Sequence, residues 1–204
     1  LLAELLNICL PKAAIQAKET QFERRFGLKF DEPLLRIRFL DEAITTSLPK
    51  DIALPISHWQ QQNIAAEYVL LITDPLNFLR FPKQPKSLAV LATDEVLDDL
   101  FRLPFLHQAK LYFWGDISVA AFQHLSDLRQ HFPKLRSFLM HKAILEKYTD
   151  LAETEKKKVA TEDLLLQADE RSCLQTLQQK EGTRKLWQRH IWQEDLLREM
   201  RRLD

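Results

Sequence analysis

The sequence predicts an α/β fold in which a parallel sheet is flanked by helices, and three observations lead to this prediction. First, residues 68–72, 87–91, 110–114 and 136–140 are short, nearly continuous apolar runs, which are typical of strands buried on both faces. Second, stretches with helical spacing of apolar residues separate these runs, and Thr93 and Ser118 precede two of them as candidate N-caps. Third, parallel neighbours need long crossover connections, and the spacing of the runs provides them.

The regions on either side of this core have a different pattern. Residues 34–40 alternate between apolar and basic side chains, as in a half-buried strand. We therefore divide the chain into a helical segment (1–33), an α/β core (34–150) and a C-terminal helical extension (151–204). The chain begins without Met inside a helical pattern, so we expect the first segment to be the end of a missing N-terminal region.

Within the extension, the polar stretch 153–158 is the expected linker to the core. From Thr161, a candidate N-cap, the pattern is helical to the end of the chain. Gly182 is expected to divide this part into two helices.

Composition limits the classes of protein to which the chain can belong. The 204 residues include 29 basic and 29 acidic side chains, so any contact with nucleic acid must come from a local patch. Cys9 and Cys173 lack the spacing of metal ligands or of a disulfide framework, and no apolar run approaches the roughly 20 residues of a membrane span. We expect a cytoplasmic protein without membrane contact.

Polar residues that follow the predicted strands are the candidate functional residues. Ligands of open parallel sheets bind beyond the carboxyl ends of the strands, where Asp74, Asp94, Asp116 and His141 lie. Asp116 follows Gly115, which permits a tight turn, and its carboxylate could face a crevice that holds a divalent cation. The alternative is that Asp116 is only a turn or helix-capping residue.

The residues around Asp116 resemble a known family. The segment Phe113-Trp-Gly-Asp-Ile117, followed by Phe132-Pro133, Arg136-Ser137 and Leu139-Met140, resembles the W-G-D-I-D and F-P-x-x-R-S-x-L-M-D motifs of the C-terminal domain of JetD, the nuclease subunit of Wadjet plasmid-defence systems. Upstream, Arg38-Phe-Leu-Asp41 is similar to the opening strand of that family. The segment Val69-Leu-Leu-Ile-Thr-Asp-Pro-Leu-Asn-Phe-Leu79 is similar to its V-E-N-x-x-N-F-L motif. Near the C-terminus, Leu186, Gln188 and Ile191 resemble parts of its L-E-Q-E-R-I motif.

The resemblance implies a toprim-like core, in which a Glu after the first strand acts near the scissile phosphate and a D-x-D pair holds magnesium. It also implies work on double-stranded DNA together with condensin-like SMC and kleisin-type subunits. Such a metal site needs several anionic oxygens, because a small hard cation is held by accumulated negative charge.

The sequence departs from the family at nearly every chemical position. Thr73 stands in the place of the Glu, Ser118 in the place of the second Asp of D-x-D, and His141 in the place of the Asp after Leu-Met, so only Asp116 matches. Trp187 and Arg189 stand where the C-terminal motif has Glu. We therefore expect no cofactor. If any activity remains, we expect Asp116 and Asp74 to bind Mg²⁺ or Mn²⁺.

A basic stretch near the C-terminus supplies the candidate DNA-binding residues. Residues 184–202 contain six Lys or Arg side chains against three acidic ones, and Arg184, Lys185 and Arg189 are the candidates for phosphate contact. The alternative is that these cations form the solvent face of an amphipathic helix.

Three functions remain open from the sequence. The first is a JetD-like subunit with a degenerate toprim domain that acts in DNA binding or assembly of the complex, with a homodimer among its possible oligomeric states. The second is a divergent metal-dependent DNA nuclease with a rebuilt site near Asp74 and Asp116. The third is a protein-interaction module whose Trp187 and Trp192 anchor a partner, since interfaces favour aromatic anchors.

Overall fold

The computed structural model describes residues 1–19, 22–29, 32–44, 49–155, 163–178 and 183–203. These residues form two compact units, Leu1–Pro33 and Leu34–Asp204. The first unit contains α1 (Leu2–Cys9), the 3-10 turn η1 (Lys12–Ala14) and α2 (Phe22–Arg25). Among the described residues, no helix is both long enough and apolar enough to cross a membrane.

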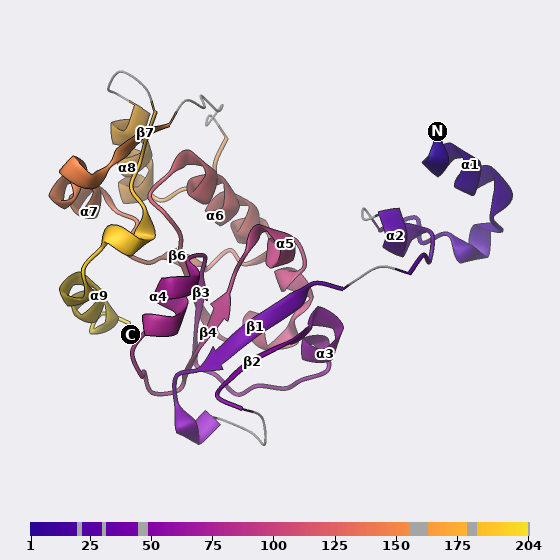
Figure 1. Ribbon diagram of the computed structural model, residues 1–204, viewed down its shortest axis with the longest axis horizontal. Coiled ribbons are helices and arrows are strands. Elements are labelled where there is room, and N and C mark those ends of the chain that lie inside the picture. Colours follow the sequence, from indigo (N-terminus) through magenta and orange to yellow (C-terminus); the bar gives the residue numbers. More distant parts are fainter. Residues whose placement is uncertain (20–21, 30–31, 45–48, 156–162, 179–182, 204) are drawn as a thin grey trace. The chain divides into compact units, whose positions relative to one another are not determined.

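The second unit is built on a six-stranded, mostly parallel sheet with the order β2-β1-β4-β3-β5-β6 (Figure 1). Neighbouring strands from β4 to β6 run parallel, whereas β1 runs antiparallel to both β2 and β4. This sheet confirms the predicted α/β class and is consistent with a toprim-like core. Its strands are β1 (Leu34–Phe39), β2 (Asp51–Pro55), β3 (Tyr68–Ile72), β4 (Ser87–Leu91), β5 (Lys110–Trp114) and β6 (Arg136–Ser137).

Most strand predictions are confirmed, and the two differences have local causes. The strand expected over residues 136–140 ends at Ser137, because Leu139 adopts a φ of 55° that extended backbone excludes. Strand β2 was not predicted. It lies at the edge of the sheet and contains Asp51, Ala53 and Pro55, so it lacks the apolar run that marks a central strand.

Helices and 3-10 turns connect and flank the strands. Ser118 caps α6 as predicted, since its hydroxyl accepts a hydrogen bond from the Ala121 N–H at 3.2 Å. Thr93 occupies the N-cap position of α5 without a side-chain hydrogen bond. The elements between β1 and β6 are η2 (Glu42–Ile44), α3 (Ile56–Gln60), α4 (Pro75–Arg80), α5 (Asp94–Leu97), η3 (Leu100–Arg102), η4 (Pro104–His107) and α6 (Val119–His131).

The C-terminal extension is helical in several elements but is not helical throughout. Thr183–Lys185 form strand β8, which pairs antiparallel with β7 (Glu153–Glu155) inside the expected linker. Leu186 continues from β8 and exchanges two backbone hydrogen bonds with Ile117, so tertiary pairing overrides the helical pattern here. Thr161 and Gly182 lie outside the described residues. The other elements are α7 (Lys142–Lys147), η5 (Thr149–Leu151), α8 (Ala168–Gln178), η6 (Gln188–His190) and α9 (Gln193–Met200).

A buried ion pair fastens α8 to α6. The Arg129 guanidinium donates to both carboxylate oxygens of Glu170 at 2.6 and 2.7 Å, and both side chains are almost fully buried. Burial favours the neutral form of Glu170, but hydrogen bonds from Arg129, Ser137 and the Gln167 N–H together outweigh it and lower the pKa of this carboxyl. The extension therefore depends on an ionised Glu170.

Replacing Glu170 should make the stability of the protein depend differently on pH. Glu170→Gln should lower the free energy of unfolding by about 3 kcal/mol at pH 7, because it leaves Arg129 buried without a counter-charge. The pKa of Glu170 is lowered in the folded state, so its contribution is complete above the unfolded value of about 4.3 and is lost as the pH falls through the folded value.

Urea unfolding of both proteins between about pH 7 and pH 3 measures this difference. Glu146→Gln, at an exposed position that pairs with Lys142 at 3.5 Å, is the matched control and should change stability by less than about 1 kcal/mol. A Glu170→Gln deficit that stays constant over the whole range contradicts the account.

Candidate functional site

The candidate site lies beyond the carboxyl ends of β3 and β5, and Gly115 forms the turn between β5 and Asp116. A Cβ at Gly115 would lie 3.0 Å from both the Ala121 Cβ and the Phe113 ring, so a larger residue here would push these neighbours apart by a few tenths of an ångström. The Gly115 N–H points to the sulfur of Met140 at 3.3 Å. Leu139, buried with a positive φ, turns the chain so that Met140 reaches this position.

Asp116 follows directly and has two partners from the C-terminal extension. Its Oδ1 accepts a hydrogen bond from the Gln188 backbone N–H at 2.7 Å. Its Oδ2 lies 3.1 Å from the Lys185 ammonium group, and both side chains are about four-fifths buried. The carboxylate that sequence comparison assigned to a metal is therefore paired with a cation of the same chain.

Asp74 follows β3 and has a similar set of partners. Its Oδ1 accepts a hydrogen bond from the Asn77 N–H at 2.9 Å and thereby caps α4. Its Oδ2 lies 3.4 Å from the Arg189 guanidinium, although Arg189 is half exposed. Asp74 itself is only 6% exposed, so this ion pair covers a nearly buried charge.

Gln188 joins the two aspartates and is the residue that sequence reasoning missed. Its side chain is fully buried. The amide oxygen accepts from the Asp74 N–H at 2.9 Å, and the amide nitrogen donates to the Trp114 carbonyl at 2.8 Å. Since its backbone N–H binds Asp116, Gln188 links the ends of β3 and β5. Its match to the Q of L-E-Q-E-R-I was the available signal.

The Trp187 ring contacts both cations of the site, Lys185 and Arg189. The Lys185 ammonium lies 3.7 Å from the centre of an indole ring, and the Arg189 guanidinium lies 5.1 Å from it. The indole N–H donates to Glu153 at 3.0 Å. Contacts of a cation with an aromatic face are attractive, so Trp187 helps to hold both cations against their aspartates.

The donor set does not fit a divalent ion. No group of three or more His, Cys, Asp or Glu side chains able to hold a metal is found among the described residues. Asp94 is exposed beside His124 at 3.9 Å, and His141 begins α7 without a capping hydrogen bond. Mg²⁺ requires several oxygen ligands in near-octahedral geometry, and these residues do not supply them.

The three candidate DNA-binding cations have partners within the protein. The Arg184 guanidinium donates to the carbonyls of Thr149 and Ala152 at 2.7 and 3.2 Å, and Lys185 and Arg189 face the two aspartates. Arg184 and Lys185 belong to β8 rather than to an amphipathic helix. Among the three, Arg189 offers the most exposed guanidinium.

Comparison with known proteins places the chain in a family. A family model described as the C-terminal region of Wadjet protein JetD matches residues 27–201. The chain belongs to this family. No curated protein matches it. Membership in the JetD C-terminal family indicates a Wadjet defence subunit and, with it, the context of a complex of several subunits.

The JetD resemblance gives the position of Arg189 a chemical meaning. Where the family motif has a Glu, this chain presents a guanidinium to Asp74. An Arg in place of a Glu changes the local charge by two units. The Arg189 guanidinium lies 3.4 Å from the Asp74 carboxylate. An internal ion pair therefore occupies Asp74, one of the two aspartates that a rebuilt metal site would need.

The linking role of Gln188 can be tested through stability. Gln188→Leu should lower the free energy of unfolding by about 1 to 3 kcal/mol, because the Asp74 N–H would be buried without a partner and the Trp114 carbonyl would keep only the Thr73 N–H. Guanidinium unfolding measures this change. Gln193→Leu, at an exposed position of α9, should stay within about 0.5 kcal/mol, and an equally small effect of Gln188→Leu would disprove the role.

Proposed function

We propose that this chain is a JetD-type subunit of a condensin-like SMC complex in plasmid defence, and that its toprim-like domain binds double-stranded DNA or assembles the complex without cutting DNA. One observation carries the proposal: the two aspartates at the carboxyl ends of the sheet pair with Lys185 and Arg189. SMC and kleisin-type subunits are the partners that family membership suggests.

The electrostatics of the site favour this function over cleavage. A divalent ion would have to displace Lys185 from Asp116 and Arg189 from Asp74, or else lie beside two positive charges. It would gain only two carboxylates in return, although such ions are held by accumulated negative charge. Without the metal, no Lewis acid stabilises the charge that develops on a scissile phosphate, and no metal-bound water is available to attack it.

The same pairing supports a role in binding. Because each aspartate is matched by a cation, this part of the protein repels the phosphates of DNA less than a cluster of free carboxylates would. Arg189 is half exposed, and it can exchange part of its contact with Asp74 for a phosphate. Trp192 is 64% exposed and provides an aromatic anchor for a partner subunit.

Metal binding and DNA cleavage test the proposal directly. In calorimetric titrations with Mg²⁺ or Mn²⁺ at millimolar concentration, the protein should take up no ion at the site. It should also leave supercoiled plasmid intact in the presence of its SMC and kleisin partners. Plasmid cutting that Asp116→Ala abolishes would refute the proposal and establish the divergent nuclease instead.

A double variant should restore a metal site if the two cations are what excludes the ion. Lys185→Gln with Arg189→Glu frees Asp116 and adds a carboxylate beside Asp74, so Mn²⁺ binding should become measurable by calorimetry. Lys12→Gln with Arg201→Glu, at two exposed positions, gives the same change in charge outside the site and should bind no Mn²⁺. Equal binding by both variants would rule out this explanation.

A further inference from the structure

A second concave site lies at the opposite end of β5 from Asp116. It has a volume of about 610 Å³ and is formed by the end of η4, the start of β5, the end of α6 and the loop that leads into β6. Lys110 begins β5 and Trp114 ends it, so the pocket and the candidate site are separated by a strand of about 13 Å. The two sites are therefore independent.

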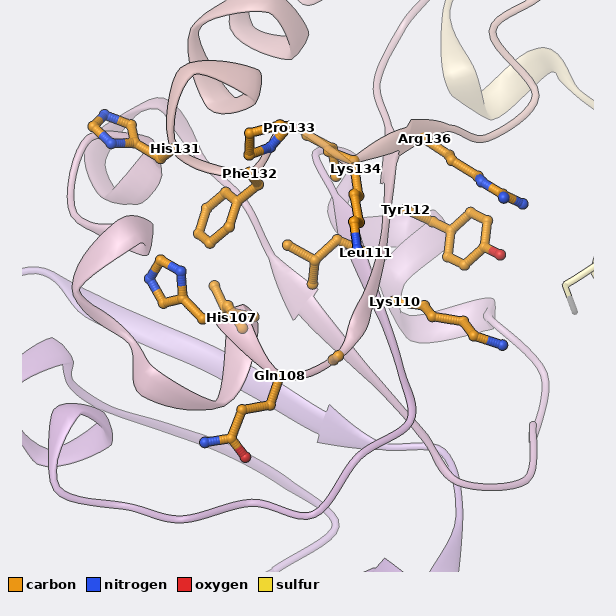
Figure 2. Close-up of a pocket in the computed structure, with 13 residues that line it drawn as sticks. His107, Gln108, Lys110, Leu111, Tyr112, His131, Phe132, Pro133, Lys134 and Arg136 are labelled. Carbon is orange, nitrogen blue, oxygen red and sulfur yellow. The ribbon is translucent and has the colours of Figure 1, made fainter.

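Apolar and aromatic side chains form the floor of this pocket. Leu106, Leu111, Phe132 and Leu135 line it and are each at most 5% exposed. The ring centres of His107 and Phe132 lie 4.9 Å apart. Figure 2 shows these two rings on one side of the pocket. His107 is exposed whereas Phe132 is nearly buried, so the imidazole ring offers the surface for a flat group.

The rim of the pocket is cationic. Lys110, Lys134 and Arg136 line it, and no Asp or Glu is among the lining residues. Figure 2 shows Lys110 and Arg136 on the side away from the His107 ring, with Lys134 between. Within the part of the chain that the structure describes, Lys134 and Arg136 have no ion-pair or hydrogen-bond partner for their charged groups. Lys110, by contrast, shares its charge with Glu67 at 3.7 Å.

These unpaired charges distinguish the pocket from the candidate site. At the carboxyl ends of the strands, Lys185 and Arg189 face aspartates of the same chain. In the pocket, the cations face a concave surface without carboxylates, although the whole chain has no net charge. A concave surface of one sign concentrates ligands of the opposite sign, so an anion is the complementary ligand.

We propose that this pocket binds a nucleoside phosphate, with the phosphate between Lys134 and Arg136 and the base against the ring of His107, which Phe132 supports from below. A guanidinium can form paired hydrogen bonds with phosphate oxygens, and an ammonium adds a second charge-assisted contact. The volume falls within the range of pockets for small organic ligands. A bare phosphate would leave the apolar floor and the rings without a function.

This ligand chemistry has two sources, a free nucleotide or the terminal nucleotide of a nucleic-acid strand. The pocket proposal does not depend on the proposed function, because none of the pocket residues contacts Asp74 or Asp116. Calorimetry with the full chain separates the sources. Its probes are ATP, AMP, orthophosphate, and a short single-stranded DNA with either a 5′-phosphate or a 5′-hydroxyl group.

We expect saturable binding of a nucleotide, free or at the phosphorylated strand end, that is at least about tenfold tighter than binding of orthophosphate. Lys134→Gln with Arg136→Gln should weaken it at least about tenfold, because both charge-assisted contacts are lost. Lys12→Gln with Arg201→Gln removes the same charge at exposed positions and should leave the affinity unchanged. Thermal unfolding of both variants checks that they fold.

Three results would overturn the proposal. The first is the absence of binding by any nucleotide or strand at millimolar concentration. The second is orthophosphate affinity equal to that of the nucleotides, which would indicate a simple anion site. The third is an equal loss of affinity in both double variants, which would indicate an effect of net charge rather than of the pocket.

If the pocket variant does not fold, Ala109→Trp, which fills the pocket, should abolish nucleotide binding, and unchanged binding would refute the proposal.

Discussion

The contact of Gln188 with the carboxyl ends of β3 and β5 is the interaction on which the candidate site depends. Its side chain satisfies the Asp74 N–H and the Trp114 carbonyl, and its backbone N–H binds Asp116. Lys185 and Arg189, on either side of Gln188 in the chain, lie against the two aspartates. The hydrogen bonds of Gln188 and the two ion pairs beside it together hold the segment in place.

In the function proposed above, this JetD-family chain keeps the scaffold of a metal site without its chemistry. The sheet, the turn at Gly115 and the aspartate that follows it are present. The positive charge beside the two aspartates comes from the side chains of Lys185 and Arg189 rather than from a metal ion. Fixed cations cannot supply the Lewis acid or the activated water that metal-dependent cleavage needs.

The parts of the fold that sequence predicted are those whose signal is local. The runs that became β3, β4 and β5 are continuously apolar because both faces of the sheet are covered, and Ser118 caps its helix through a residue only three positions away. Thr183–Lys185 pair instead with residues 28 to 32 positions earlier in the chain, and three residues are too few to show a strand period. Gln188 gave a motif match but no indication of its role, since a neutral amide acquires that role only from the groups that surround it.

A crystal structure of the protein grown with Mn²⁺, with anomalous diffraction recorded to locate the metal, tests the central claim most directly. The account predicts no manganese peak beside Asp74 or Asp116, with Lys185 and Arg189 still in contact with the two carboxylates. A manganese ion coordinated by both aspartates, with Lys185 turned away, would contradict it.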